Sequence, residues 1–157
     1  SKNNFKPIYN NPMSQGTRCH QLSTYIVHDS PLTMLADNPS IYKNESECTD
    51  FITSIPNTGI EKTVVLQGTL GEYIVTARCV GSDWYIGGMT NWDARTITLD
   101  FSFLDNGEYA AVLFKDGVNA DEQAFDYKKE VMKITAQSKL TVRMASGGGF
   151  AISLRKI

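Results

Sequence analysis

The sequence predicts a mainly β protein, an antiparallel two-sheet β-sandwich of about eight strands preceded by a short helical segment. Three observations predict this class. Near Pro56 the apolar pattern changes from helical spacing to alternation in steps of two. Segments of about five to nine residues then follow, separated by Gly, Asp, Asn or Ser turns. Their connections are mostly too short for crossover helices, so neighbouring strands should run antiparallel.

The first helix is predicted from an apolar stripe. Leu22, Tyr25 and Ile26 recur at intervals of three and four residues, which places them on one helix face. The helix should begin between Ser14 and Thr17 and stop at the Asp29-Ser30-Pro31 stretch. Nothing earlier in the sequence offers this stripe a packing partner, so we expect its partner to lie outside the chain.

Two further helices are predicted before Pro56. A short one is expected over Leu32–Ala36, with Pro31 in its first turn and residues 37–39 (Asp-Asn-Pro) as its terminator. Asn44 followed by Glu47 has the spacing of a capping box, which predicts the start of a third helix. The apolar residues that share one face of that helix are Cys48, Phe51, Ile52 and Ile55.

The strands are predicted from alternation. In residues 95–101, Ile97, Leu99 and Phe101 point to one side and the polar residues between them point to the other. The same alternation recurs along the second half of the chain. The predicted strands are Thr63–Gln67, Glu72–Val80, Trp84–Thr90, Thr96–Phe101, Tyr109–Lys115, Lys129–Thr135, Leu140–Ala145 and Phe150–Arg155.

Composition excludes several classes of protein. With 41% hydrophobic and 20% charged residues, the 157-residue chain can bury a real core and is too apolar to be disordered. The net charge of −2 and the scattered Lys and Arg residues argue against a nucleic-acid partner. No apolar run approaches the roughly 20 residues that a bilayer span needs. We therefore expect no nucleic acid and no membrane among its partners.

No residue pattern predicts a metal or catalytic site in this chain. Cys19, Cys48 and Cys79 lack zinc-site spacing and are expected to be unpaired thiols, although a single disulfide stays open. The acidic stretch Asp116–Tyr127 does not match a calcium loop and is expected to be a solvated connection. The glycine run Ser146–Phe150 leads into a strand, which is typical of a turn or bulge and not of a phosphate loop.

Aromatic residues raise one alternative. Trp84, Tyr85 and Trp92 could stack on sugar rings, as aromatic side chains do in carbohydrate-binding modules. They lie in or beside a predicted strand, where an aromatic side chain usually packs in the core. Trp84 and Trp92 therefore stand as the sugar-stacking residues of the alternative interpretation.

Three long stretches carry a family resemblance: residues 12–42 ("PMSQGTRCHQLSTYIVHDSPLTMLADNPSIY"), 71–96 ("GEYIVTARCVGSDWYIGGMTNWDART") and 114–130 ("FKDGVNADEQAFDYKKE"). In this order they resemble the C-terminal end of glycoside hydrolase family 97. The resemblance implies a parent enzyme with an N-terminal β-supersandwich, a (β/α)8 barrel and a C-terminal β-sandwich, which hydrolyses α-glucosides or α-galactosides with calcium near its active site. It also implies a periplasmic location, with a signal peptide upstream.

By this resemblance, residues 1–55 are the terminal helical segment of the barrel and residues 56–157 are the C-terminal sandwich, which buttresses the barrel. The catalytic carboxylates and the calcium ligands of the parent lie outside this chain, so the chain alone is expected to be inactive and to hold no metal. Gln15, Thr17 and Arg18 fall near the loop before the last barrel helix, where barrel enzymes place their active sites. They are the candidates for residues near the oligosaccharide substrate.

Two interpretations of different classes follow. In the first, the chain is the C-terminal part of a glycosidase whose missing barrel and N-terminal domain are its partners. Leu22, Tyr25 and Ile26 would then be partly bare without the barrel, and residues 1–55 would mediate self-association. In the second, the sandwich is a non-catalytic carbohydrate-binding module. An adhesion or scaffolding domain is a more distant third.

Overall fold

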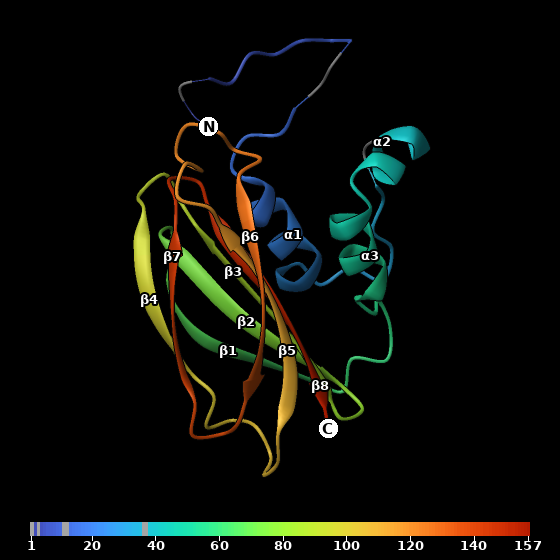
Figure 1. Cartoon of the computed structure of the whole chain (residues 1–157), viewed down its shortest axis with the longest axis vertical. Helices are drawn as coiled ribbons and strands as arrows, with labels where there is room; N and C mark the ends of the chain where they lie inside the picture. The colour runs from blue at the N-terminus through green and yellow to red at the C-terminus, as the bar shows by residue number, and fades with distance from the viewer. Residues whose placement is uncertain (1, 3, 11–12, 36–37) are drawn as a thin grey trace.

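The structure is a computed structural model that describes residues 2, 4–10, 13–35 and 38–157. Within these residues the chain forms three α-helices followed by eight β-strands (Figure 1). The elements are α1 (Arg18–Val27), α2 (Pro39–Asn44), α3 (Ser46–Ser54), β1 (Lys62–Thr69), β2 (Tyr73–Val80), β3 (Asp83–Thr90), β4 (Arg95–Asp100), β5 (Tyr109–Asp116), β6 (Tyr127–Ile134), β7 (Lys139–Met144) and β8 (Gly149–Lys156).

The strands form two antiparallel sheets, as the sequence predicts. Six strands pair in the order β1-β2-β3-β8-β5-β6, and β4 pairs with β7 in a separate sheet. A register shift between Val65 and Gln67 interrupts the β1–β2 ladder at the sheet edge. All eight predicted strands are confirmed, with ends that differ by at most two residues from the predicted bounds. No helix among the described residues is long and apolar enough to cross a membrane.

Two hydrophobic clusters lie on opposite faces of the six-stranded sheet. The larger one fills the space between the sheets and includes Trp84, Phe101 and Phe150. The smaller one lies on the outer face, where α1 and α3 cover the sheet and Phe51 meets Phe114 with ring centroids 4.8 Å apart. In Figure 1 the helices accordingly lie on one side of the large sheet, and β4 and β7 lie on the other.

The apolar stripe of α1 packs on the sandwich itself. Leu22 and Ile26 are buried at 2% and 0% exposure in the outer cluster, and Tyr25 is half-buried. The expectation that these residues need a partner outside the chain is therefore wrong for Leu22 and Ile26. Periodicity identifies which face of a helix is buried, but it does not identify the surface that buries it. Each such side chain contributes about 2 kcal/mol by leaving water.

Two small residues let α1 lie this close to the sheet. A Cβ atom at Gly87 of β3 would come within 2.9 Å of the Ser23 carbonyl oxygen and 3.0 Å of Ile26 Cβ. At Gly149 of β8, a Cβ atom would meet His20 Cα at 2.9 Å. Backbone-to-backbone approach at these two strands therefore requires glycine, and any side chain would push the helix outward.

The C-terminal end of α1 is held by an arginine on β2. Arg78 is buried, and its Nη2 donates to the carbonyl oxygen of Val27, the last residue of the helix, at 3.2 Å. Nη1 lies 3.5 Å from Asp29. A cation at this end of a helix is favourable because the terminal carbonyl groups carry partial negative charge. Arg78 thus fastens the helix end to the sheet.

The second helix is not where the sequence pattern places it. Residues 32–35 form no helix, and Ala36 lies outside the described residues. The helix begins instead at Pro39, and Asn38 is its N-cap, with Oδ1 accepting from the backbone N–H groups of Ser40 and Ile41 at 3.1 Å. The Asn-Pro pair that predicts a terminator is an N-cap followed by proline at the first helical position.

The third helix is confirmed, but its predicted start is wrong. It begins at Ser46, and its N-cap is Glu45, which makes no side-chain capping bond. Asn44 closes α2 and therefore cannot open a capping box. The predicted face is correct, since Cys48, Phe51 and Ile55 are buried.

The three cysteines are free thiols. Cys19 and Cys48 are buried in the outer cluster, and Cys79 is half-buried. Burial raises the pKa of the Cys19 and Cys48 thiols, which keeps them protonated and unreactive. They serve as small apolar core residues, as the sequence predicts for unpaired thiols.

We predict that Gly87→Ala destabilises the chain by about 1–3 kcal/mol, because the new methyl group overlaps the backbone of α1. Thermal or urea unfolding measures the change. Adding Val27→Ala should recover part of the loss, because Val27 Cγ2 lies 3.0 Å from the position of the new Cβ. A Gly87→Ala variant that is as stable as the unmodified chain would show that α1 is not held in close contact with β3.

Candidate functional site

The N-terminal end of α1 is anchored by one buried carboxylate. Asp116, the last residue of β5, is 7% exposed, and its Oδ1 accepts a hydrogen bond from Thr17 Oγ1 at 2.6 Å. Its Oδ2 accepts from the backbone N–H groups of Ala145 and Gly149 at 2.8 and 2.9 Å. One side chain therefore joins the start of the helix, the end of β5 and the turn between β7 and β8. We call this arrangement the Asp116 junction.

The Thr17 hydroxyl forms hydrogen bonds both with Asp116 and with the backbone of α1. Thr17 is the N-cap of α1 and accepts from the His20 N–H at 3.1 Å while it donates to Asp116. Its own backbone N–H donates to the Gly147 carbonyl oxygen at 2.9 Å. The helix start is thus tied to the sandwich by side chain and backbone together.

The run of three glycines makes room for this junction. A Cβ atom at Gly148 would lie 2.0 Å from Asp116 Oδ2, and Gly147 has a φ of +62°. The prediction of a turn glycine cluster is confirmed, with a more specific reason: the carboxylate fits only where the β7–β8 turn carries no side chain.

The predicted solvated connection is present over residues 117–126, but Asp116 itself is buried and is not part of it. Burial raises the pKa of this carboxyl group, and its three hydrogen-bond donors act in the opposite direction by stabilising the charged form. The neighbouring Asp121 accepts from the Ser146 N–H at 2.9 Å and pairs with Arg143, and these contacts lower its pKa. Both acids are structural parts of the junction. The signal in the sequence was an aspartate that directly ends an apolar strand.

The three residues predicted to lie near the substrate have separate roles. Thr17 is 1% exposed and committed to Asp116. Arg18 forms an ion pair with Glu45 at 2.8 Å, and its guanidinium lies 5.5 Å from the centre of the Tyr127 ring. The Gln15 side chain is exposed, and the backbone carbonyl oxygen of Gln15 accepts a hydrogen bond from Gln21 Nε2. The structure therefore does not bring the three side chains together in one polar site.

The sugar-stacking residues are also separated. Trp84 is 5% exposed in the core between the sheets, with Phe103 at 4.9 Å, so a sugar ring cannot reach it. Tyr85 is buried on the opposite face of the same strand. Trp92 is half-buried, with Lys2 Nζ 5.6 Å from its ring centre. Trp84 therefore packs in the core, as its place in a strand predicts, and the exposed pair that the alternative interpretation requires is absent at Trp84 and Trp92.

Two carboxylates share a pocket of about 310 Å³ beside α3, namely those of Glu47 and Asp50. Glu47 accepts from the Tyr127 hydroxyl at 2.7 Å and from Lys129 Nζ at 3.1 Å, and these two donors lower its pKa. A glycosidase general acid needs the reverse, a carboxyl group that holds its proton near neutral pH. Glu47 is therefore not suited to the role of general acid.

The metal-ligating residues do not gather either. Across residues 2, 4–10, 13–35 and 38–157, no three His, Cys, Asp or Glu side chains group so that they could hold an ion. Calcium requires six to eight convergent oxygen ligands, and the carboxylates described above do not gather in such a group. These residues do not fit a calcium ion.

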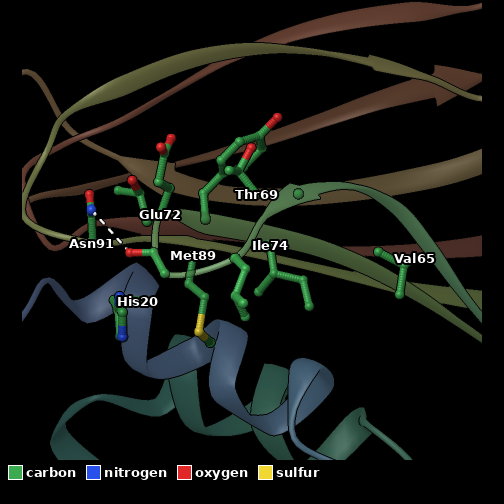
Figure 2. Close-up of a pocket in the computed structure, with 12 residues that line it drawn as sticks. His20, Val65, Thr69, Glu72, Ile74, Met89 and Asn91 are labelled. Carbon is green, nitrogen blue, oxygen red and sulfur yellow. Dashed lines mark hydrogen bonds between the residues drawn. The ribbon is translucent and has the colours of Figure 1, made fainter.

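A groove of about 500 Å³ lies on the outer face of the large sheet. It lies between the β1–β2 hairpin and α1, and Figure 2 shows Ile74 and Met89 projecting from the strands toward the helix, with His20 at one end and Val65 at the other. Asn91 Nδ2 donates to the Gly71 carbonyl oxygen at the hairpin tip at 3.3 Å. We call this the β1–β2 groove.

The sequence analysis missed this groove. Val65, Ile74 and Met89 occupy outward positions of β1, β2 and β3, where strict alternation would place polar residues. Leu70, at the hairpin turn, also lines the groove and is fully exposed. The adjacent pair Val64-Val65, with one residue on each face, was the available signal.

Comparisons with known proteins agree along the whole chain. The family model described as "Glycosyl-hydrolase 97 C-terminal, oligomerisation" matches residues 59–155. The chain is 53% identical to a retaining alpha-galactosidase of Bacteroides thetaiotaomicron over 99% of its own length and 23% of that protein's. It is 27% identical to a probable retaining alpha-galactosidase of Streptomyces bingchenggensis, covering 83% of this chain and 19% of that protein.

A solved structure gives the same result. The chain is similar to a Glycoside Hydrolase Family 97 enzyme in complex with acarbose from Pseudoalteromonas sp. strain K8, with a TM-score of 0.88 and 36% identity. The match covers 94% of this chain and 24% of that one. The chain thus spans about a quarter of the length of the relatives it matches.

The Asp116 junction yields a stability prediction. Asp116→Ala should cost about 2–5 kcal/mol, because it leaves two buried N–H groups and the Thr17 hydroxyl without an acceptor. Asp116→Asn keeps one acceptor oxygen and should cost less. Urea unfolding measures both, with Glu122→Ala, an exposed acid of the same connection, as the control expected within about 0.5 kcal/mol of wild type. Equal losses at Asp116 and Glu122 would contradict the anchoring role.

Proposed function

The chain belongs to glycoside hydrolase family 97, and on that premise we propose that it is the C-terminal part of an enzyme that hydrolyses α-galactosides or α-glucosides. The 53% identity to a retaining alpha-galactosidase over nearly the entire chain carries this proposal and favours α-galactosides. In this proposal the sandwich buttresses a catalytic (β/α)8 barrel and takes no part in the chemistry.

The fold supports a buttressing role through α1. We propose that residues 1–55 are the terminal helical segment of the barrel and that residues 56–157 are the C-terminal sandwich. Both ends of α1 are fastened to the sandwich, by Asp116 at one end and Arg78 at the other. If α1 is also part of the barrel wall, the sandwich holds that wall in place from outside.

The rest of the parent enzyme is the partner we propose for the exposed apolar side chains of the first 55 residues. This set differs from the stripe predicted from periodicity and includes Leu32, Met34 and Leu35, of which Met34 is 82% exposed. Apolar side chains that gather in this way mark interaction surfaces. When the barrel and the N-terminal domain are absent, the same residues should promote self-association through residues 1–55 at high concentration.

Further expectations belong to the parent enzyme. We place its oligosaccharide substrate, its catalytic carboxylates and its calcium ligands in the barrel, and Gln15, with an exposed side chain, is the residue of the predicted set that could lie closest to the substrate. A periplasmic location follows only from the family resemblance. The alternative function, a free-standing carbohydrate-binding module, is not favoured by any described pair of exposed aromatic residues.

We predict that the 157-residue chain hydrolyses neither p-nitrophenyl α-galactoside nor the α-glucoside, whereas the full-length enzyme hydrolyses at least one of them. Glycoside hydrolysis needs two carboxyl groups about 5–9.5 Å apart on either side of the scissile bond. Glu45, Glu47 and Glu130 are instead each held by a lysine, arginine or hydroxyl donor of the protein. Release of p-nitrophenol, with and without added calcium, measures both proteins side by side.

Two results would contradict this proposal. Turnover by the short chain that disappears when one of its own carboxylates is replaced would place catalysis here. A full-length enzyme inactive on both substrates would refute the assignment of substrate class. Retention of the short chain on a starch or galactan gel would favour the binding-module alternative.

A further inference from the structure

We propose that the β1–β2 groove is the surface through which two copies of the enzyme associate, with the hairpin tip of each copy inserted into the groove of the other. The proposal rests on the proposed function only in taking the chain as part of a larger family 97 enzyme. It assigns to particular residues an oligomerisation property that the family description gives only to the domain as a whole.

The family model indicates where this interface should lie. The model matches residues 59–155, which leaves out the helical segment. Within that span, the described large hydrophobic residues that stay exposed are Val65, Leu70, Val118, Phe125 and Val131. Val65 and Leu70 line the same concave surface, together with Ile74 and Met89. The other three residues do not line this groove.

The remaining three residues have different surroundings. Val131 lies on β6, the opposite edge of the sheet, beside the lysines at positions 128, 129 and 133. Edge strands rich in lysine are typical of edges protected against association. Val118 and Phe125 lie in the β5–β6 connection, where Phe125 lines a pocket with Phe5 and Met13 of the N-terminal segment. Apart from Ala124 and Phe125, that pocket is lined by residues of the segment that we assign to the barrel, whereas His20 is the one residue of that segment among those that line the β1–β2 groove.

The outer face of the sheet is covered unequally. α1 packs over β3 and β8, and α3 packs over β5 through Phe51 and Phe114. α1 also reaches part of β2, but no helix among the described residues packs over the outer face of β1. Val65 is 62% exposed on that face. The groove is therefore a gap beside α1 of the kind that an apolar side chain or a short segment of another chain fills.

The charges at the rim are already neutralised. Glu72 pairs with Arg95 at 3.0 Å, and the imidazole Nδ1 of His20 lies 3.2 Å from the Gly148 carbonyl oxygen. Burying the groove therefore leaves no lone charge without a partner. Interface cores are depleted of charged residues in the same way.

A second copy of the enzyme suits this surface because an exposed apolar side chain, that of Leu70, lies directly beside the groove. Leu70 stands fully exposed at the end of the groove that it lines. In a two-fold arrangement the same patch of both copies meets, so each Leu70 can enter the groove of its partner near Ile74 and Met89. A stable interface buries about 800 Å² on each side, so the contact must extend along the whole β1–β2 hairpin.

The test compares one substitution at the two edges of the same sheet. Val65→Glu and Val131→Glu change the same residue type at exposures of 62% and 72%. In the full-length enzyme, where the barrel covers residues 1–55, sedimentation velocity should show Val65→Glu and Leu70→Asp raising the dissociation constant of the dimer at least about tenfold. Val131→Glu should sediment as wild type. Circular dichroism of each variant should match that of wild type, because these side chains are exposed.

Three results would overturn the proposal. The first is a wild-type full-length enzyme that stays monomeric. The second is a dimer that survives Val65→Glu but is lost with Met34→Glu, which would place the interface on residues 1–55. The third is a Val65→Glu enzyme with an unchanged oligomeric state and a lowered melting temperature, which would show that the groove is covered within one copy. Hydrolytic activity is recorded separately, so an inactive but dimeric enzyme would refute the proposed function and not this interface.

Discussion

The buried carboxylate of Asp116 is the interaction on which the rest of the structure depends. Its three hydrogen-bond donors come from residues 17, 145 and 149, so one side chain joins segments that are more than 100 residues apart in the sequence. A buried carboxylate is costly unless it is fully hydrogen-bonded, which makes this arrangement sensitive to the exact position of each donor. The start of α1, the end of β5 and the β7–β8 turn must therefore be in place together.

This constraint explains why helix and sandwich form one packed unit. Asp116 holds the N-terminal end of α1, Arg78 holds its C-terminal end, and Gly87 lets its middle approach the sheet. Asp116 and Arg78 are used in these internal contacts. A unit built in this way fits the proposed role of a rigid support for the barrel of the parent enzyme. The apolar surface that it leaves open is suited to contacts with the parent enzyme and with another copy.

Local patterns in the sequence predicted the strands well, because alternation reports which side chains share a face. Ile97, Leu99 and Phe101 are buried together as expected. The same patterns failed where the partner is distant. Leu22 and Ile26 were correctly assigned to one helix face but were expected to be partly bare without the barrel. They are buried instead against the outer face of β3 and β8, more than 50 residues away. Asp116 was assigned to a solvated loop because its donors lie at both ends of the chain. Asn38-Pro39 was ambiguous, since an Asn-Pro pair can follow one helix or begin the next.

Native-state hydrogen exchange of the α1 amides tests the central claim most directly, because it measures whether the helix can open while the sheets stay folded. If Asp116, Arg78 and Gly87 make helix and sandwich one cooperative unit, the most protected amides of α1 will exchange with the same free energy as those of β3 and β8. The contrary result is α1 amides that exchange through a low-energy local opening while β3 and β8 remain protected, which would mean that the helix is only loosely docked on the sandwich.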